Sequence, residues 1–470
     1  MYLEKCTIRN IKCFEEITLD FRNPDGSIRL WNVLIGENGT GKTTLLQAIA
    51  IALLGEKAAS VLLPRPQGWV RTGAAKGEIA ATMYPGPGDF EMADAGTEAA
   101  RRLGHHLDVS YEITEKTSRG ENNPKITEHK GLDYARLEKI RSPEIISWLA
   151  AGYGPFRRLG GGTEHASQIA QMNTREARFV TLFLEDAALS DCETWLMDLD
   201  YARLDPSEPE QQQHSASLLN LIRETLNDSL LPEDVKLDAI TSRGVFFRTP
   251  YSDKVRILDL SDGYRAMLAL AIDLIRLLCV VPMEDTALLF HTNSEWLHHV
   301  SAVVLIDEID VHLHPTWQRE IGLWLKQHFP RVQFIVATHS PFIPQIADDN
   351  GLFTLRHALG TDAVQVEQEE TSVQGWRADQ ILSILFDTPS MYDPETEQRL
   401  REYGRLKSLD QVGRLSDDQA ARFAELRQWV EHYLAPSGDT REEMQYYRDS
   451  HRRVQELSKL FREQKLNDKD

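Results

Sequence analysis

The fold is decided by the stretch Gly36-Glu37-Asn38-Gly39-Thr40-Gly41-Lys42-Thr43, which fits the phosphate-loop pattern G-x-x-x-x-G-K-[ST]. It follows an apolar run, Leu30–Ile35, typical of a short strand, and it precedes Thr44–Ala50, typical of a helix start. Glycines let the backbone curl so that several N–H groups point at phosphate oxygens, and the helix N-terminus adds its positive dipole end. A plain glycine turn before a helix is the alternative, but the strand–loop–helix context predicts a bound nucleoside triphosphate.

Individual residues of this loop have different expected roles. We expect Lys42 to reach the β- and γ-phosphates and the Thr43 hydroxyl to bind Mg²⁺. The residues predicted to bind the nucleotide here are Gly36, Asn38, Gly39, Gly41, Lys42, Thr43 and Thr44. The expected cofactors are therefore ATP and Mg²⁺.

Two carboxylates follow a second apolar strand. A buried strand is predicted over Ala302–Ile306, and its continuously apolar part, Val303–Ile306, ends in Asp307 and Glu308. A buried strand would deliver Asp307 beside the phosphate loop, where it can hold Mg²⁺, and would leave Glu308 placed to polarise the attacking water. Such a pair can also simply mark a strand leaving the core, but a phosphate loop upstream favours the catalytic interpretation.

A histidine ends the next apolar strand. Ala337-Thr338-His339-Ser340-Pro341 follows the apolar run Val332–Ala337. A histidine at this place can donate a hydrogen bond to the γ-phosphate. A structural histidine is the alternative, and the spacing from Glu308 favours a role in catalysis.

A third polar turn lies between a strand and a long helix. In Leu260-Ser261-Asp262-Gly263-Tyr264-Arg265, the Ser261 side chain and the Gly263 N–H lie at the start of the helix predicted over Tyr264–Leu278, which makes a second anion-binding end. Helix capping by Ser261 or Asp262 explains the same residues without a ligand. The distance from the phosphate loop along the chain suggests that this turn contacts a nucleotide bound to another subunit.

The ordered set of phosphate loop, Leu-Ser-Asp-Gly turn, Asp-Glu strand end and histidine resembles the ABC-type ATPases. Ile8–Phe14 and Asp307–Pro315 resemble the soluble RecF/SMC-like and OLD-like branch, grouped with the AAA family. The resemblance implies an α/β, ABC-ATPase-type P-loop fold, a mixed sheet with a parallel core. It also implies a head-to-tail homodimer or higher homo-oligomer that sandwiches ATP. Its implied catalytic residues are Lys42, Glu308 and His339, its metal ligands Thr43 and Asp307, and its cross-subunit contacts Ser261 and Gly263.

The chain departs from the transporter branch of this family in two ways. Asp262 stands where transporters carry glycine, and Tyr264-Arg265 replaces their usual glutamine. The sequence also leaves two alternatives for the residue that serves as the glutamine loop of this family. Gly152–Arg157 occupies its place in one interpretation, and Gln168 or Gln171 serves in the other.

The domain organisation follows from these motifs and from the helical stretches between them. We expect an N-terminal ATPase lobe over residues 1–140, a helical insertion over 141–230, the rest of the ATPase core over 231–375, and a helical partner-binding extension over 376–470. Glu56–Gly131, rich in glycine, proline and alanine, is predicted to be irregular apart from a strand at Leu107–Ile113. Helices are predicted around Ser142–Ala151, across Thr174–Leu204 and over Glu442–Gln464, and Pro206–Gln213 is predicted to be a polar linker.

The composition of the chain limits where in the cell we expect the protein and which kinds of partner it can bind. The formal net charge of −20 argues against nucleic-acid binding through bulk charge. The four cysteines show no metal spacing and no disulfide framework, which suits a reducing cytosol. With no apolar signal core and no run long enough to span a bilayer, we expect a cytoplasmic protein without a membrane partner.

A weaker resemblance bears on function. Tyr153–Arg157, Leu182-Phe183, Trp195-Leu196 and Trp376–Leu382 are similar to ATPase subunits of bacterial antiphage systems such as Septu and PARIS, although packing alone also explains these aromatic residues. The implied function is an ATPase that controls a separate nuclease subunit, with DNA or a phage-derived molecule as trigger. A RecF/SMC-like DNA repair ATPase is the alternative, and a transporter motor fits worst.

Overall fold

The computed structural model describes most of the chain. The described residues are 1–84, 90–91, 101–102, 106–116, 122–141, 149–157, 159, 163, 166, 168–169, 174–189, 191–231, 235–279, 297–358, 360–388 and 390–433. They divide into two compact units, Met1–Asp387 and Thr388–Asp470, which are described separately. Within the described ranges, no helix has the length and apolar character needed to cross a bilayer.

The centre of the first unit is a six-stranded sheet that is parallel except at one edge. In sheet order its strands are β16 (Val364–Glu369), β15 (Leu352–His357), β3 (Trp31–Gly36), β14 (Val332–Ala337), β13 (Ala302–Ile306) and β9 (Ala150–Tyr153), with β16 antiparallel to its neighbour. Every residue of β3, β13 and β14 is buried. Parallel strands covered on both faces read as continuous apolar runs, so these three could be predicted from sequence. The mixed sheet with a parallel core is confirmed.

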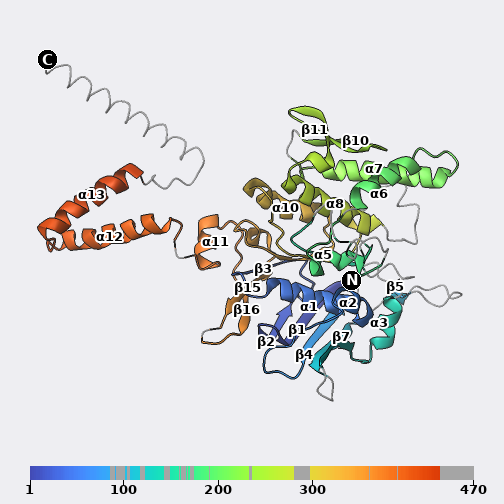
Figure 1. Cartoon of the computed structure of the whole chain (residues 1–470), viewed down its shortest axis with the longest axis horizontal. Helices are drawn as coiled ribbons and strands as arrows, with labels where there is room; N and C mark the ends of the chain where they lie inside the picture. Colours follow the sequence, from blue (N-terminus) through green and yellow to red (C-terminus); the bar gives the residue numbers. More distant parts are fainter. Residues whose placement is uncertain are drawn as a thin grey trace. The chain divides into compact units, whose positions relative to one another are not determined.

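Alternate side chains of these strands enter two different cores. Val304 and Val336 pack in a cluster with helices α8 (Asp262–Cys279) and α10 (Pro315–His328). Leu305 packs in a second cluster with α1 (Lys42–Leu54) and the N-terminal strands. This follows from the two-residue period of a strand. Figure 1 shows α8 and α10 on one side of β3 and β15, with α1 on the other.

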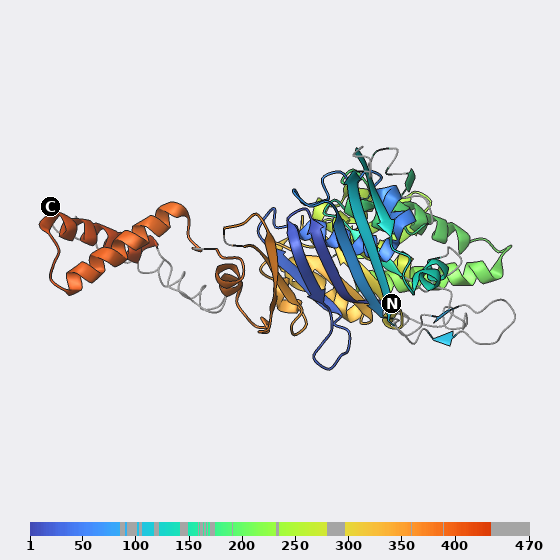
Figure 2. The same ribbon diagram turned by 90° about the horizontal axis from the view of Figure 1, so that it is seen from below.

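An antiparallel sheet covers the far side of α1. Its order is β2 (Phe14–Asp20), β1 (Tyr2–Ile11), β4 (Gly77–Tyr84), β7 (Leu107–Lys116) and β8 (Asn122–Glu128), and Figure 2 shows its long blue strands side by side. The strand predicted at Leu107–Ile113 is confirmed within β7, and the prediction that the rest of Glu56–Gly131 is irregular is wrong. This stretch also contains α2 (Glu56–Leu62) and the short pair β5 (Phe90–Glu91) and β6 (Arg101–Arg102).

The helical region between the two halves of the core is more broken than the sequence indicated. The predicted helix across Thr174–Leu204 is instead a 3₁₀ turn η1 (Ala177–Phe179), α5 (Val180–Phe183) and α6 (Asp191–Ala202). The predicted linker Pro206–Gln213 is wrong in its second half, because α7 (Pro209–Asn227) starts with proline at its first turn, where no backbone donor is lost.

Two further predicted helices lie partly or wholly outside the described residues. Only the end of Ser142–Ala151 is described, and there β9 starts at Ala150. The predicted helix Glu442–Gln464 lies outside the described residues.

The remaining elements complete the first unit. They are α3 (Tyr134–Ile140), the sheet of β10 (Lys236–Thr241), β11 (Gly244–Thr249) and β12 (Ser252–Arg256), the 3₁₀ turns η2 (Ile257–Asp259) and η4 (Pro344–Ile346), and α11 (Ala378–Ile384). Ile381 of α11 is buried in the same cluster as α8 and α10. By its contacts, α11 therefore belongs to the first unit.

The described part of the second unit is a helical hairpin. It pairs α12 (Pro394–Gln411) with α13 (Asp417–Tyr433), and the Asp393 carboxylate caps α12 by accepting from the N–H groups of Glu395 and Thr396. The Tyr403 and Phe423 rings stack with their centroids 5.4 Å apart.

Candidate functional site

The phosphate loop leaves β3 and turns directly into α1. Gly41, with φ of 88°, occupies the cap position of α1, and no side chain caps the helix. A side chain at Gly41 would lie 2.6 Å from the Cys13 Sγ and 2.8 Å from the Phe14 ring, so only glycine fits. Because the first-turn N–H groups of a helix have no intrahelical acceptor, this uncapped helix start is suited to an anion.

Lys42 crosses back over the loop. Its Nζ donates to the carbonyl oxygens of Gly36 at 2.7 Å and Glu37 at 3.0 Å. Thr40 Oγ1 donates to the same Glu37 carbonyl at 2.8 Å. The side chain is buried, and burial lowers the pKa of Lys42. The ammonium group is thus held within the loop, beside the helix start.

Thr43 and Asp307 meet although 264 positions separate them in the chain. The Thr43 Oγ1 donates to Asp307 Oδ2 at 2.6 Å. The other oxygen, Asp307 Oδ1, is buried without a hydrogen-bond partner. Burial raises the pKa of Asp307, while the Thr43 hydroxyl lowers it. A hydroxyl and a carboxylate with an unused oxygen are ligands that Mg²⁺ takes together with nucleotide phosphates, and the bound cation would keep the carboxylate ionised.

Glu308 and His339 lie at the ends of neighbouring parallel strands. Glu308 has a φ of 45°, a left-handed conformation uncommon for a residue with a side chain. Asp310 links the two strand ends, because its Oδ1 accepts from Thr338 Oγ1 and from the His339 N–H. Burial lowers the pKa of His339 and the Lys42 charge lowers it further, although Asp310 and Glu308 act in the opposite direction. His339 is therefore held in its neutral form near pH 7.

Ser261 and Gly263 lie at the start of α8, next to a different part of the site. Ser261 is exposed, whereas Gly263 is buried against the loop that follows Asp307 and Glu308. A side chain at Gly263 would lie 2.5 Å from the His312 carbonyl oxygen. The Tyr264 ring meets Trp317 edge to face at 4.3 Å between centroids. The structure thus brings Lys42 and Thr43 to Asp307, and brings Gly263 to His312 rather than to the phosphate loop.

The sequence did not single out Arg157 as a site residue, although it lies within a stretch noted for the glutamine loop. Its guanidinium is buried and donates to the carbonyl oxygens of Asp307, Glu308 and Ile309. Burial lowers the pKa of Arg157 to about 10. As for the other candidates, Gln168 is exposed and Gln171 lies outside the described residues.

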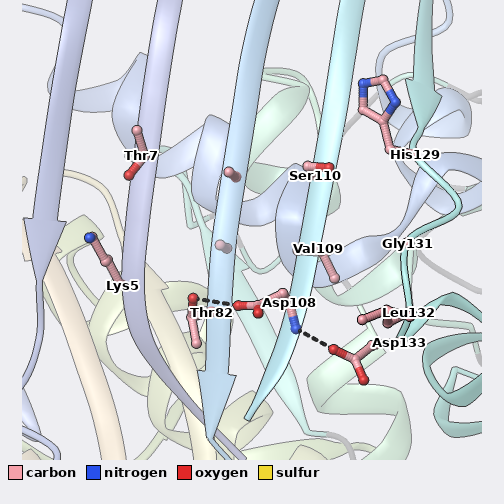
Figure 3. Close-up of a pocket in the computed structure, with 12 residues that line it drawn as sticks. Lys5, Thr7, Thr82, Asp108, Val109, Ser110, His129, Gly131, Leu132 and Asp133 are labelled. Carbon is pink, nitrogen blue, oxygen red and sulfur yellow. Dashed lines mark hydrogen bonds between the residues drawn. The ribbon is translucent and has the colours of Figure 1, made fainter.

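Two cavities among the described residues are lined by none of these site residues. One, of about 400 Å³, lies on the outer face of the antiparallel sheet and is lined by residues that include Lys5, His129 and Asp133 (Figure 3). Three of its polar residues are bonded to one another, since Thr82 Oγ1 donates to Asp108 Oδ1 at 2.7 Å and the Asp108 N–H donates to Asp133 Oδ2 at 3.1 Å.

A phosphate loop at the end of β3 and a carboxylate-ended strand in the same parallel sheet define the chain as a P-loop ATPase. The family model described as "AAA domain, putative AbiEii toxin, Type IV TA system" matches residues 31–343. The chain belongs to this family.

Individual relatives agree with this class. The chain is 26% identical over 389 residues to the Septu protein PtuA of Bacillus mycoides (strain KBAB4), which covers 82% of this chain and 44% of that protein. It is 24% identical over 449 residues to the retron Ec83 probable ATPase of Escherichia coli, which covers 85% of this chain and 79% of that protein. The chain thus spans less than half the length of PtuA.

Among solved structures, the Smc head bound to the C-winged helix domain of ScpA is similar. The two chains are 15% identical, with a TM-score of 0.47, over 79% of this chain and 98% of that chain.

Proposed function

We propose that the chain is the ATP-binding and ATP-hydrolysing subunit of an antiphage defence complex that controls a separate nuclease. The observation that carries the ATPase part is the Thr43–Asp307 pair, whose unpartnered Asp307 Oδ1 lies beside the uncapped start of α1. Similarity to the Septu protein PtuA and to a retron ATPase supports the defence part.

Each side chain has a stated task in this proposal. Lys42 and the N–H groups of Gly39, Gly41 and Thr44 bind the phosphates, with Gly36 and Asn38 completing the loop. Thr43 and Asp307 hold Mg²⁺, which when bound neutralises charge on the transferred phosphoryl group.

Glu308 and His339 act on the reacting atoms. Glu308 polarises the attacking water, and His339 donates one ring N–H to the γ-phosphate. With its pKa lowered, the His339 ring is neutral and has one donor and one acceptor nitrogen. Asp310 accepts from the His339 backbone N–H and so helps to fix the position of the residue.

The site is proposed to be completed by a second copy of the chain. Ser261 is exposed at the N-terminus of α8, where its hydroxyl and the Gly263 N–H can reach an anion outside their own subunit. A homodimer or higher homo-oligomer would then form around bound ATP. Residues 376–470 are the proposed region for contact with the nuclease, and DNA or a phage-derived molecule the proposed trigger.

The proposal is tested in cells that carry the whole defence system. Lys42→Ala removes the ammonium that binds phosphate, so it should abolish protection against phage. Lys57→Ala is the matched control, because Lys57 is exposed and pairs with Glu138 at 3.0 Å, and it should leave protection unchanged. Full protection by Lys42→Ala would contradict the proposal. Salt-dependent DNA binding by the isolated chain would instead favour a repair ATPase.

A further inference from the structure

The backbone that presents Glu308 is held by one buried side chain, Arg157, which lies in the loop after β9. The Arg157 guanidinium donates through one nitrogen to the carbonyl oxygens of Gly154 and Asp307, both at 3.0 Å. Its second nitrogen donates to those of Glu308 at 3.0 Å and Ile309 at 3.3 Å. The side chain is 3% exposed, so water does not compete for these bonds.

We propose that Arg157 is a positioning residue for ATP hydrolysis, which holds Glu308 in its left-handed conformation by binding the carbonyl oxygens of Asp307, Glu308 and Ile309. The inference rests on the ATPase part of the proposed function and is independent of the nuclease.

The conformation of Glu308 needs such support. A left-handed backbone is unfavourable for a residue with a side chain and persists only where the surroundings enforce it. Two neighbouring strands help, since Asp307 N–H donates to the Tyr153 carbonyl at 2.8 Å and Ile309 N–H donates to that of Ala337 at 3.1 Å. The carbonyl oxygens between these two anchors are the ones that Arg157 binds. Without it, three buried acceptors would lose a charged donor.

The turn that carries Arg157 is in turn tied to α5. Gly154 passes so close to α5 that a side chain there would lie 2.0 Å from the Thr181 carbonyl oxygen. Gly154 N–H donates to Thr181 Oγ1 at 3.3 Å, and Gln47 of α1 donates to the Leu182 carbonyl at 2.9 Å. One connected path of contacts therefore joins the phosphate-loop helix, α5, the end of β9 and Glu308.

Arginine is suited to this task and lysine is not. A guanidinium offers five donors in a planar fork, whereas an ammonium is a compact charge with three donors on a flexible stem. Arg157→Lys therefore keeps the charge but cannot hold the same four carbonyl oxygens.

The first test measures ATP hydrolysis by Arg157→Lys and Arg157→Gln, with kcat expressed per Mg–ATP-binding site. We expect kcat to fall about 100-fold, the size of effect that a misplaced catalytic group produces, with Kd for Mg–ATP within about threefold of wild type. The matched control is Arg141→Lys. The Arg141 side chain is 6% exposed but bonds to Glu128, Tyr111 and Ala52, so this variant should lose stability and keep kcat.

The second test asks whether Arg157 acts through Glu308. In a Glu308→Gln background, Arg157→Lys should change kcat by less than about threefold, because the group it positions is already gone. Two results would overturn the inference. One is a double variant whose loss of kcat equals the product of the two single losses, and the other is a kcat for Arg157→Lys equal to that of wild type.

A third measurement does not depend on turnover. Amide hydrogen exchange of Ile309 and Val311 should be faster in Arg157→Lys than in wild type and unchanged in Arg141→Lys, and equal exchange in the two variants would contradict the inference. A wild-type chain that binds no Mg–ATP would refute the proposed function, while this measurement would still decide the role of Arg157.

Discussion

Glu308 combines a strained backbone with a place beside the proposed metal ligand Asp307. Glu308→Gln removes the carboxylate but keeps the size of the side chain, so it should lower kcat about 10²–10⁴-fold and leave Mg–ATP binding intact. The ATP-bound oligomer should accumulate, because the step that dissolves it is slowed. Steady-state turnover and light scattering with Mg–ATP measure the two effects. Glu320→Gln, at an exposed position on α10, is the control, and turnover of Glu308→Gln close to that of wild type would refute the role of Glu308.

His328 makes stability depend on pH. It is buried against the Trp324 ring at 4.8 Å between centroids, and burial lowers the pKa of His328, with His298 adding to this effect and Asp228 opposing it. The unfolded chain takes up the proton near pH 6.5 and the folded chain only at lower pH. The stability that the neutral ring contributes is therefore complete above pH 6.5 and is lost as the pH falls through the lowered pKa.

A neutral replacement should remove this component. His328→Gln should show a smaller drop in Tm between pH 8 and pH 5 than wild type, as followed by thermal unfolding at both pH values. His357→Gln, at an exposed position, should keep the wild-type drop. Equal drops in all three proteins would show that His328 does not contribute.

At the scale of the element, the start of α8 is packed without spare room. Gly263→Ala would place its methyl group 2.5 Å from the His312 carbonyl oxygen, so either α8 or the loop must move. We expect the free energy of unfolding to fall by about 1–3 kcal/mol. ATP hydrolysis should fall while Mg–ATP binding by the separate chain persists, because Gly263 is proposed to serve the nucleotide of a partner copy.

A second glycine provides the control for Gly263→Ala. Gly404 lies inside α12 with open space around it, so Gly404→Ala should raise the free energy of unfolding by about 0.5–1 kcal/mol and leave turnover unchanged. Urea unfolding and steady-state hydrolysis measure both variants. If Gly263→Ala behaved like Gly404→Ala, the close packing of α8 on His312 would not matter for activity.

How far the sequence predicted these elements depended on the kind of pattern. β13 and β14 were predicted at their observed bounds, because buried parallel strands are continuous apolar runs. β4 was missed, because Gly77–Tyr84 alternates buried and half-exposed residues and its neighbours are rich in glycine and proline. In the site, the motifs predicted that Asp307 lies beside the phosphate loop, and its hydrogen bond with Thr43 agrees with that placement. Arg157 could not be predicted, since the carbonyl oxygens it binds lie about 150 positions away and any residue offers a carbonyl.

At the scale of the whole molecule, the proposed ATP site and the C-terminal helices belong to different units of the chain. Every predicted nucleotide residue lies in Met1–Asp387, and the hairpin of α12 and α13 belongs to Thr388–Asp470. A chain that ends at Asp387 keeps α11, whose Ile381 is buried in the core, and should therefore fold cooperatively and hydrolyse ATP at a rate close to that of the full chain.

The same truncation should lose the nuclease if the C-terminal unit carries the contact. Co-purification of each chain with the product of its neighbouring gene measures binding, and kcat measures the site. A control chain that ends after residue 375 removes α11 as well, exposes the core surface under Ile381 and Leu385, and should lose stability. If the chain that ends at Asp387 still binds the nuclease, the contact lies within the first unit, because the second unit is absent from that chain.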